Sequence, residues 1–257
     1  ICKYQIVYYQ IIKKDNKKEG HYFMKISDMT EKELAEKLIL EVINYEENAG
    51  QIFNFPFIRK GSFAILPQLC MGDKNLNGHY TTCLNVTNDM LNDWNIDKSK
   101  IFQLAAENSA KEFPISIEAI TEFLDSNAIH TFLEDSFDIS QVYVLSNKTY
   151  FNGAAAIFYP DALDKTATTL GANKLFILPI SIDYVYCMSI DNGISENELV
   201  ELSKEISKEL EKENRLGDNL MIYDTANQTI KECGGDTYMV TFDLENNLQN
   251  KKVNGGR

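Results

Sequence analysis

Three polar side chains in turns of the second half are the candidates for ligand binding: Asn147, Asn152 and Ser181. Ser181 follows an apolar, strand-like run, a position where enzymes often carry function. If the chain has a ligand site, we expect it where the turn at residues 146–153 could meet the turn at 179–183. Amides and hydroxyls bind polar ligands, but they also bond the backbone of their own turns. We favour the second, architectural interpretation.

Carboxylates are the most abundant reactive groups. The 257 residues include 38 Asp and Glu against 25 Lys and Arg, a formal charge of −13. This acidity excludes broad binding to nucleic-acid phosphates, which requires a basic face. A pair of carboxylates could form the general acid and base of a hydrolase. An acidic stripe spaced like phosphates could imitate nucleic acid, whereas evenly spread charge would only keep the protein soluble.

The sequence contains no motif for a cofactor or a metal ion. It lacks the phosphate loops GxxxxGK[ST] and GxGxxG, the nucleophile motif GxSxG and the zinc motif HExxH. The three histidines, His21, His79 and His130, are far apart. We therefore expect no metal site and no cofactor.

The cysteines and the apolar runs bear on the compartment. No run approaches the ~18 apolar residues of a membrane helix, and no signal-peptide pattern is present. The chain begins with Ile1 rather than Met, which we interpret as a trimmed start or a native start further upstream. We expect a cytoplasmic protein without membrane contact, whose cysteines are reduced core thiols. The five are widely spaced without a CxxC pair: Cys2, Cys70, Cys83, Cys187 and Cys233.

A capping box predicts a helix near the N-terminus. The Thr30 hydroxyl can accept a bond from an early helix N–H, while Glu33 reaches back to the cap. We expect the helix to run to about Asn48, since four apolar residues fall on one stripe with helical spacing: Leu34, Leu38, Val42 and Tyr45.

The remaining elements follow from alternation, turn residues and helix caps. In the first half we expect hairpins of residues 2–13 with 21–27 and of 62–71 with 79–86, and helices capped by Thr87, Asp97 and Ser116. In the second half we expect strands at 141–145, 153–159, 174–180, 184–190, 220–224, 229–233 and 237–244, and helices after Pro160 and Ser195.

Short turns between most strands favour antiparallel pairing, so we expect an α+β fold with about five helices packed on a twisted sheet. Residues 1–244 would form one domain, with two halves meeting near residues 126–140. The polar tail at 245–257 would be frayed.

Several segments in order resemble one family. They are VINYEEN at 42–48 with FPF at 55–57, VTNDMLNDW at 86–94 with LAAEN at 104–108, YVLSN at 143–147 with NGAA at 152–155, YP at 159–160 with FILPISI at 176–182, and RLGD at 215–218 with MIYD at 221–224. Together they resemble the bacterial domain-of-unknown-function family 5688, common in gut Firmicutes. The resemblance implies a bacterial, cytoplasmic protein, and it implies no activity and no catalytic residues.

We therefore expect a soluble, non-enzymatic interaction or regulatory protein with a protein partner. The first alternative is a hydrolase that uses carboxylates and polar turn residues, with a pocket where Asp, Glu, Asn and Tyr converge and one carboxyl has a raised pKa. The second alternative is an acidic inhibitor that imitates nucleic acid and is carried on a mobile element.

Overall fold

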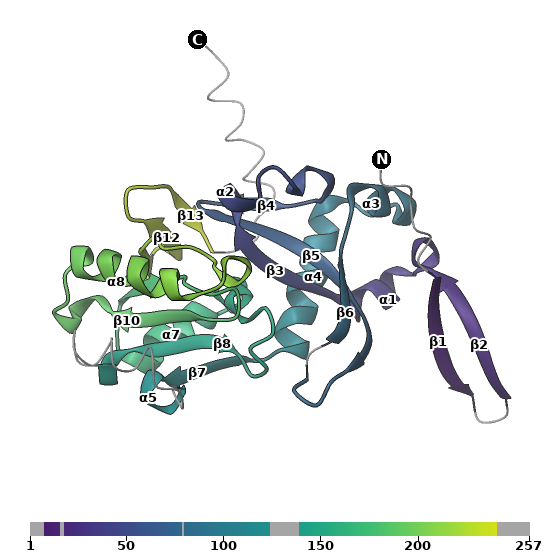
Figure 1. Ribbon diagram of the computed structural model, residues 1–257, viewed down its shortest axis with the longest axis horizontal. Coiled ribbons are helices and arrows are strands. Elements are labelled where there is room, and N and C mark those ends of the chain that lie inside the picture. The colour runs from purple at the N-terminus through teal and green to yellow at the C-terminus, as the bar shows by residue number, and fades with distance from the viewer. Residues whose placement is uncertain (1–7, 16–17, 79, 124–138, 241–257) are drawn as a thin grey trace, which may run out of the picture.

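The computed structural model describes residues 8–15, 18–78, 80–123 and 139–240, which form an α+β fold (Figure 1). All described strand pairs are antiparallel, as the sequence predicts. Some sequence-based expectations lie outside the described residues. They concern the start of the first strand, Cys2, His79, His130, the segment at 126–138 where two halves would meet, and the tail at 245–257.

A seven-stranded sheet organises the second half of the chain. Its order is β13-β12-β11-β9-β10-β8-β7. Most neighbours in the sheet are also close in sequence, which short turns allow. The strands are β7 (Ile115–Ala119), β8 (Tyr143–Asn147), β9 (Lys174–Leu178), β10 (Val185–Ser189), β11 (Met221–Asp224), β12 (Thr229–Glu232) and β13 (Thr237–Met239).

Helices cover both faces of this sheet. Along β9, Phe176 and Leu178 pack with the residues of α8 (Glu196–Glu209), while Leu175 and Ile177 belong to the larger core on the other face. That other face is covered by the 3₁₀ helix η4 (Gly153–Phe158) and by α7 (Ala162–Leu170). Successive side chains on a strand point to opposite faces, so a run that is apolar at every position is buried on both sides.

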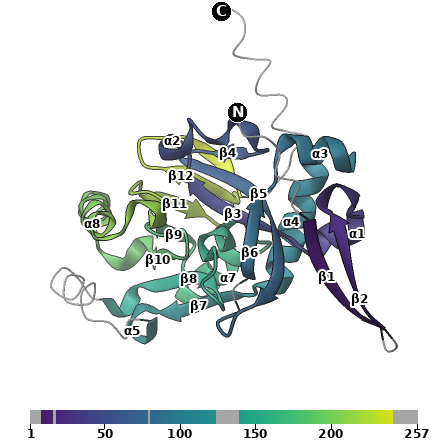
Figure 2. The ribbon, with the colours of Figure 1, turned by 45° about the vertical axis from the view of Figure 1, so that its right-hand side comes forward.

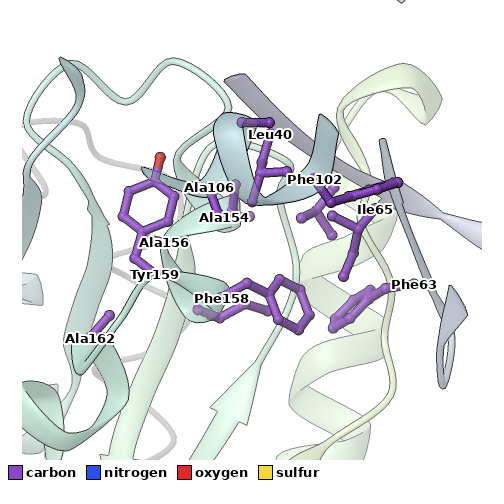
Figure 3. Close-up of a cluster of buried hydrophobic side chains, with 14 of the residues drawn as sticks. Leu40, Phe63, Ile65, Phe102, Ala106, Ala154, Ala156, Phe158, Tyr159 and Ala162 are labelled. Carbon is purple, nitrogen blue, oxygen red and sulfur yellow. The ribbon is translucent and has the colours of Figure 1, made fainter. Parts of the chain in front are cut away.

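A second sheet shares the larger core. Its strands β3 (Leu38–Asn44), β4 (Ile58–Lys60), β5 (Phe63–Lys74) and β6 (Tyr80–Asn85) pair around β5, and α4 (Lys98–Glu112) packs on β3 and β5. Figure 3 shows the side chains where the two halves meet: Leu40, Phe63, Ile65 and Phe102 lie beside Ala154, Ala156, Phe158 and Tyr159. One continuous core therefore holds α7 and η4 against both sheets.

Polar contacts fix the end of the large sheet to the small one. The backbone N–H and the hydroxyl of Ser62 donate to Glu232 Oε1 at 2.7 and 2.9 Å, and Lys60 Nζ donates to the carbonyl of Met239 at 2.7 Å. Gly61 between them has φ 57°, and a Cβ there would lie 2.1 Å from Glu232 Oε1. The close approach therefore requires glycine.

The remaining elements are short. The hairpin of β1 (Tyr8–Asp15) and β2 (Lys18–Lys25) extends away from the other elements in both ribbon views (Figures 1 and 2). None of the helices within the described residues is long and apolar enough to cross a membrane. The other helices are η1 (Ile26–Asp28), α1 (Glu31–Ala35), α2 (Tyr45–Asn48), η2 (Ile52–Asn54), α3 (Asn88–Trp94), α5 (Ile120–Phe123), η3 (Ile139–Gln141), η5 (Ile190–Asn192) and η6 (Lys212–Asn214).

Four of the predicted helix caps are confirmed. The side chains of Thr30, Thr87, Asp97 and Ser195 each accept a bond from a backbone N–H three residues later. Gly171 ends α7 with φ 63°, the left-handed conformation that glycine adopts at little cost. Caps depend on residues close in sequence, which makes them predictable locally.

The predicted helix over residues 30–48 is wrong. It stops at Ala35, and Leu38–Asn44 forms β3, paired with β5 in the register Leu40↔Pro67. The stripe of Leu34, Leu38 and Val42 fits both periodicities, and the apolar surface offered by β5 and α4 decides for the strand. Tertiary contacts commonly override local preference in this way.

Two further element assignments are wrong. Residues 115–119 form strand β7 before the short helix α5, because Ser116 pairs with Ser146 on β8 instead of opening a helix. The predicted strand at 153–159 is the 3₁₀ helix η4, which starts after Asn152 in a left-handed conformation with φ 50°. The small side chains of Ala154–Ala156, all buried, let this coiled segment pack closely under the sheet.

The expectation of reduced cysteines is wrong for one pair. Cys70 on β5 and Cys83 on β6 occupy directly opposite positions and form a disulfide, with their Cα atoms 4.0 Å apart. The hairpin register places the two side chains on the same face, where a bond can form. Cys187 and Cys233 are free thiols.

Candidate functional site

The two turns selected from the sequence meet in the fold. Ser146 Oγ donates to the carbonyl of Asp183 at 2.6 Å, and the backbone N–H of Ala154 donates to the carbonyl of Ile182 at 3.0 Å. A Cβ on Gly153 would lie 2.0 Å from Ser146 Oγ and 2.1 Å from the carbonyl oxygen of Asp183. The turns therefore touch through one side-chain hydroxyl and through backbone atoms, which leaves no room for a ligand between them at this point.

Asn147 and Ser181 are occupied by their own turns. The buried amide of Asn147 donates to the carbonyl of Phe151 at 2.8 Å and accepts from the backbone N–H and hydroxyl of Thr149 at 3.0 and 2.9 Å. Ser181 Oγ accepts from the backbone N–H of Asp183 at 3.1 Å. These bonds favour the architectural interpretation for both residues, and a role in ligand binding stays a prediction.

Asn152 is the exception, because its side chain leaves the turn. Its Nδ2 donates to Gln68 Oε1 on β5 at 3.0 Å, and its backbone N–H donates to Asp183 Oδ1 at 3.2 Å. Gln68 in turn donates to Asn85 Oδ1 on β6 at 3.1 Å. A buried amide thus connects the turn of one sheet to the strands of the other.

The same network contains a carboxyl group that sequence reasoning missed. Burial raises the pKa of Glu41 on β3 to about 7, against a smaller lowering by its hydrogen bond to Gln68. We call Glu41, Gln68, Asn152 and Asp183 the Glu41 network. A carboxyl that titrates near neutral pH can transfer protons. The signal was available as a single acid within the apolar run Leu38–Ile43, but Glu41 is not among the residues selected from the sequence.

A separate cavity of about 220 Å³ lies where α7 begins, beside β11 and β12. Its walls are largely apolar, and Ala106, Phe158 and Ala162 in the wall belong to the shared core (Figure 3). We call it the α7 pocket. Its polar lining consists of Tyr159, Asp161, Asp164, Tyr223 and Gln228.

The polar side of the α7 pocket is held by hydrogen bonds. Asp164 Oδ1 accepts from the Tyr223 hydroxyl at 2.8 Å and from Gln228 Nε2 at 3.0 Å, and its Oδ2 accepts from Gln228 Nε2 at 2.9 Å. Burial and the bond to Asp164 raise the pKa of Tyr223 above its usual range. Tyr223 therefore stays a neutral donor, and the carboxylate keeps a fixed orientation.

Asp161 completes the rim from an unusual backbone position. It is the N-cap residue of α7 with φ 58°, and its side chain makes no capping bond. The exposed carboxylate is consequently free of the helix end. No sequence signal marks this pocket, because Asp164 and Tyr223 are 59 positions apart.

The chemistry expected for a hydrolase is divided between two places. The carboxyl group with the raised pKa, Glu41, lies in the Glu41 network. The Asp and Tyr side chains that line a cavity lie in the α7 pocket, and Glu41 does not line that pocket. Within residues 8–15, 18–78, 80–123 and 139–240, no group of three His, Cys, Asp or Glu residues is arranged to hold a metal ion.

Comparison with known proteins gives one match. A family model described as "Family of unknown function (DUF5688)" matches residues 2–225. Neither the curated proteins nor the solved structures contain a match.

Proposed function

The chain belongs to this family of unknown function, and from that premise we propose that it is a non-enzymatic interaction protein with a regulatory role, whose binding site is the α7 pocket. Binding pockets combine apolar walls with a few polar groups in fixed positions. The α7 pocket has both features.

The observation that carries the proposal is the bonding of Asp164. Its two oxygens are oriented by Tyr223 and Gln228 before any ligand arrives. Such preorganisation lowers the entropy lost on binding. An acid or base catalyst requires a pKa near the working pH, and the raised pKa of Tyr223 moves this group in the opposite direction. The pair is therefore better suited to holding a ligand than to proton transfer.

The proposal includes the origin and the domain organisation. We infer a bacterial chain of Firmicutes origin, because the family resemblance implies one. We infer that residues 1–244 fold as one domain, because both sheets contribute to one core.

A cytoplasmic location is the third part of the proposal, and the disulfide gives a test of it. Disulfides rarely persist in the reducing cytoplasm, so the oxidation state of Cys70 and Cys83 in growing cells tests this location. Rapid alkylation of intact cells, followed by mass spectrometry, measures this directly. A bond already present before lysis would contradict a cytoplasmic location.

Binding without turnover is the test of the function. A mixture of small metabolites would be incubated with the full-length chain, and ligand-observed NMR would identify compounds that bind. We expect bound compounds to be recovered unchanged, with competition for one site. A compound that is consumed, with consumption abolished by one polar substitution that leaves the fold intact, would contradict the proposal.

One observation favours a hydrolase as the second candidate. The pKa of Glu41 near 7 suits a general base, and Gln68 and Asn152 could orient it. In that case the rate of hydrolysis by the unchanged chain would rise with pH, with a midpoint near the pKa of Glu41. The substitution Glu41→Gln would abolish hydrolysis. Unchanged hydrolysis in Glu41→Gln would remove this candidate.

A further inference from the structure

We propose that the ligand of the α7 pocket is a small organic cation, an ammonium group attached to one ring or a short apolar chain. This inference rests on the proposed function, since it names the ligand class of the same site.

The size of the cavity sets the size of the ligand. An apolar cavity of about 150 Å³ is large enough for benzene, and the α7 pocket measures about 220 Å³. Drug-sized ligands occupy pockets of roughly 300 Å³ or more. The α7 pocket therefore fits one ring with a short substituent.

The charge of the lining sets the sign of the ligand. Asp161 and Asp164 are its charged residues, and the lining contains no Lys or Arg. Within the described part of the chain, no ion pair involves either carboxylate. Asp164 is oriented by neutral donors alone, so its negative charge is not compensated by a neighbouring side chain. An ammonium group would supply the missing charge and form a charge-assisted hydrogen bond.

The helix dipole does not reverse this preference. The N-terminus of α7 carries about +0.5 elementary charge, which alone would attract an anion. Asp161 at the N-cap and Asp164 two residues after the first helical position contribute two formal negative charges at the same place. The sum is negative, so cations are attracted and anions are repelled.

Aromatic residues form part of the apolar wall of the pocket. Phe158, Tyr159 and Tyr223 line the pocket together with the two carboxylates. The lining therefore recognises the ring or chain of the ligand by apolar contact and its ammonium group by charge.

The test compares three compounds of one shape and different charge: benzylamine, benzyl alcohol and benzoate. Calorimetric titration of the full-length chain at neutral pH and low salt should show benzylamine binding at least about tenfold more tightly than benzyl alcohol. Benzoate should not bind. Equal binding of benzylamine and benzyl alcohol, or tighter binding of benzoate, would overturn the inference.

Two substitutions and one control connect the effect to the pocket. Asp164→Asn keeps an oxygen that can accept from Tyr223, and Asp161→Asn keeps the left-handed backbone, which asparagine tolerates. Each should weaken benzylamine binding by about tenfold or more and leave benzyl alcohol unchanged. The control Glu201→Gln removes an equal charge from α8, which covers the opposite face of the large sheet. It should change the affinity for neither benzylamine nor benzyl alcohol. The unfolding midpoint of each variant shows whether it folds. If one of Asp161→Asn and Asp164→Asn does not fold, the binding measured with the other variant tests the inference.

The outcome also separates this inference from the proposed function. A neutral or anionic compound that binds in the α7 pocket while benzylamine does not would disprove the ligand class and leave the binding function in place. If no compound of the metabolite screen or the benzyl series binds in the pocket, both the function and the ligand class fail.

Discussion

Asn152 Nδ2 lies 3.0 Å from Gln68 Oε1, and this bond joins residues 84 positions apart. Asn152 precedes η4, which leads into α7, while Gln68 is on the central strand of the small sheet. The bond therefore fixes the segment that forms one wall of the α7 pocket.

Removing the Asn152 side chain should destabilise the fold. Asn152→Gly removes the hydrogen bond to the buried Gln68 Oε1, which costs about 1–3 kcal/mol, and glycine keeps the positive φ. Asn152→Ala should cost about 1 kcal/mol more, because alanine resists the left-handed conformation. Urea unfolding of both variants measures these losses. Equal stability of Asn152→Gly and the unchanged chain would show that the bond contributes nothing.

Gly153 lies where the turn at residues 146–153 contacts the turn at 179–183, and we expect it to tolerate no larger residue. A Cβ at this position would lie 2.1 Å from the backbone oxygen of Asp183, which cannot move without separating the two turns. We expect Gly153→Ala to cost about 3 kcal/mol or more, since overpacking of a tight contact is expensive.

Gly50 provides the matched control, because nothing lies within 4 Å of a Cβ built there. In thermal unfolding, Gly153→Ala should lower the unfolding midpoint strongly. Gly50→Ala should leave the midpoint almost unchanged. Similar midpoints for the two variants would contradict the close contact between the turns.

The pKa of Glu41 predicts a dependence of stability on pH. Burial raises this pKa from its ordinary value of 4.5 to about 7 in the folded chain, so the folded state binds the proton more tightly than the unfolded state does. The contribution of Glu41 to the free energy of unfolding is complete below pH 4.5, decreases as the pH rises and is lost above pH 7. The full effect is on the order of 3 kcal/mol.

Glu41→Gln isolates this effect, because glutamine is neutral at every pH. The variant and the unchanged chain should be similarly stable near pH 4.5, and the variant should be more stable above pH 7. Urea unfolding at several pH values measures the difference. A difference that does not change with pH would show that Glu41 titrates normally.

The disulfide should stabilise the β5–β6 hairpin. Cys70 and Cys83 close a loop with a sequence separation of 13, for which about 2–3 kcal/mol is expected from the loop closure in the unfolded chain. The double variant Cys70→Ser with Cys83→Ser should therefore unfold at lower urea.

Alkylation of the unfolded chain provides the chemical control. Reduction should expose two additional thiols, while Cys187 and Cys233 react with or without reductant. An unchanged number of reactive thiols would contradict the disulfide.

Sequence patterns predict those elements that depend on neighbours in the chain. The caps at Thr30, Thr87, Asp97 and Ser195 are short-range contacts and were predictable. The assignment failed for Leu38–Asn44, whose pattern suits a helix or a strand until β5 is placed beside it. The pair Cys70–Cys83 did not follow from the predicted turn at residues 72–78, whose middle lies closer to Cys70 than to Cys83. The observed register places the two residues opposite each other and includes an irregularity between Met71 and Lys74.

The candidate site was predictable only in part. The place where the two turns could meet was selected from the sequence, and Ser146 and Asp183 do touch. The strand order that brings them together could not be derived from the sequence. The α7 pocket could not be found, because Asp164 and Gln228 are 64 positions apart and no spacing rule connects them. Their contact depends on the register of β11 with β9, which a single sequence does not specify.

Mapping a bound ligand tests the central claim most directly. An isotope-labelled full-length chain would be titrated with the tightest compound from the metabolite screen or the benzyl series, and amide chemical shifts would be followed. Binding at the α7 pocket predicts the largest shifts at Asp161, Asp164, Tyr223 and Gln228. Shifts centred instead on Glu41 and Asn152, or scattered evenly over the described residues, would contradict the account.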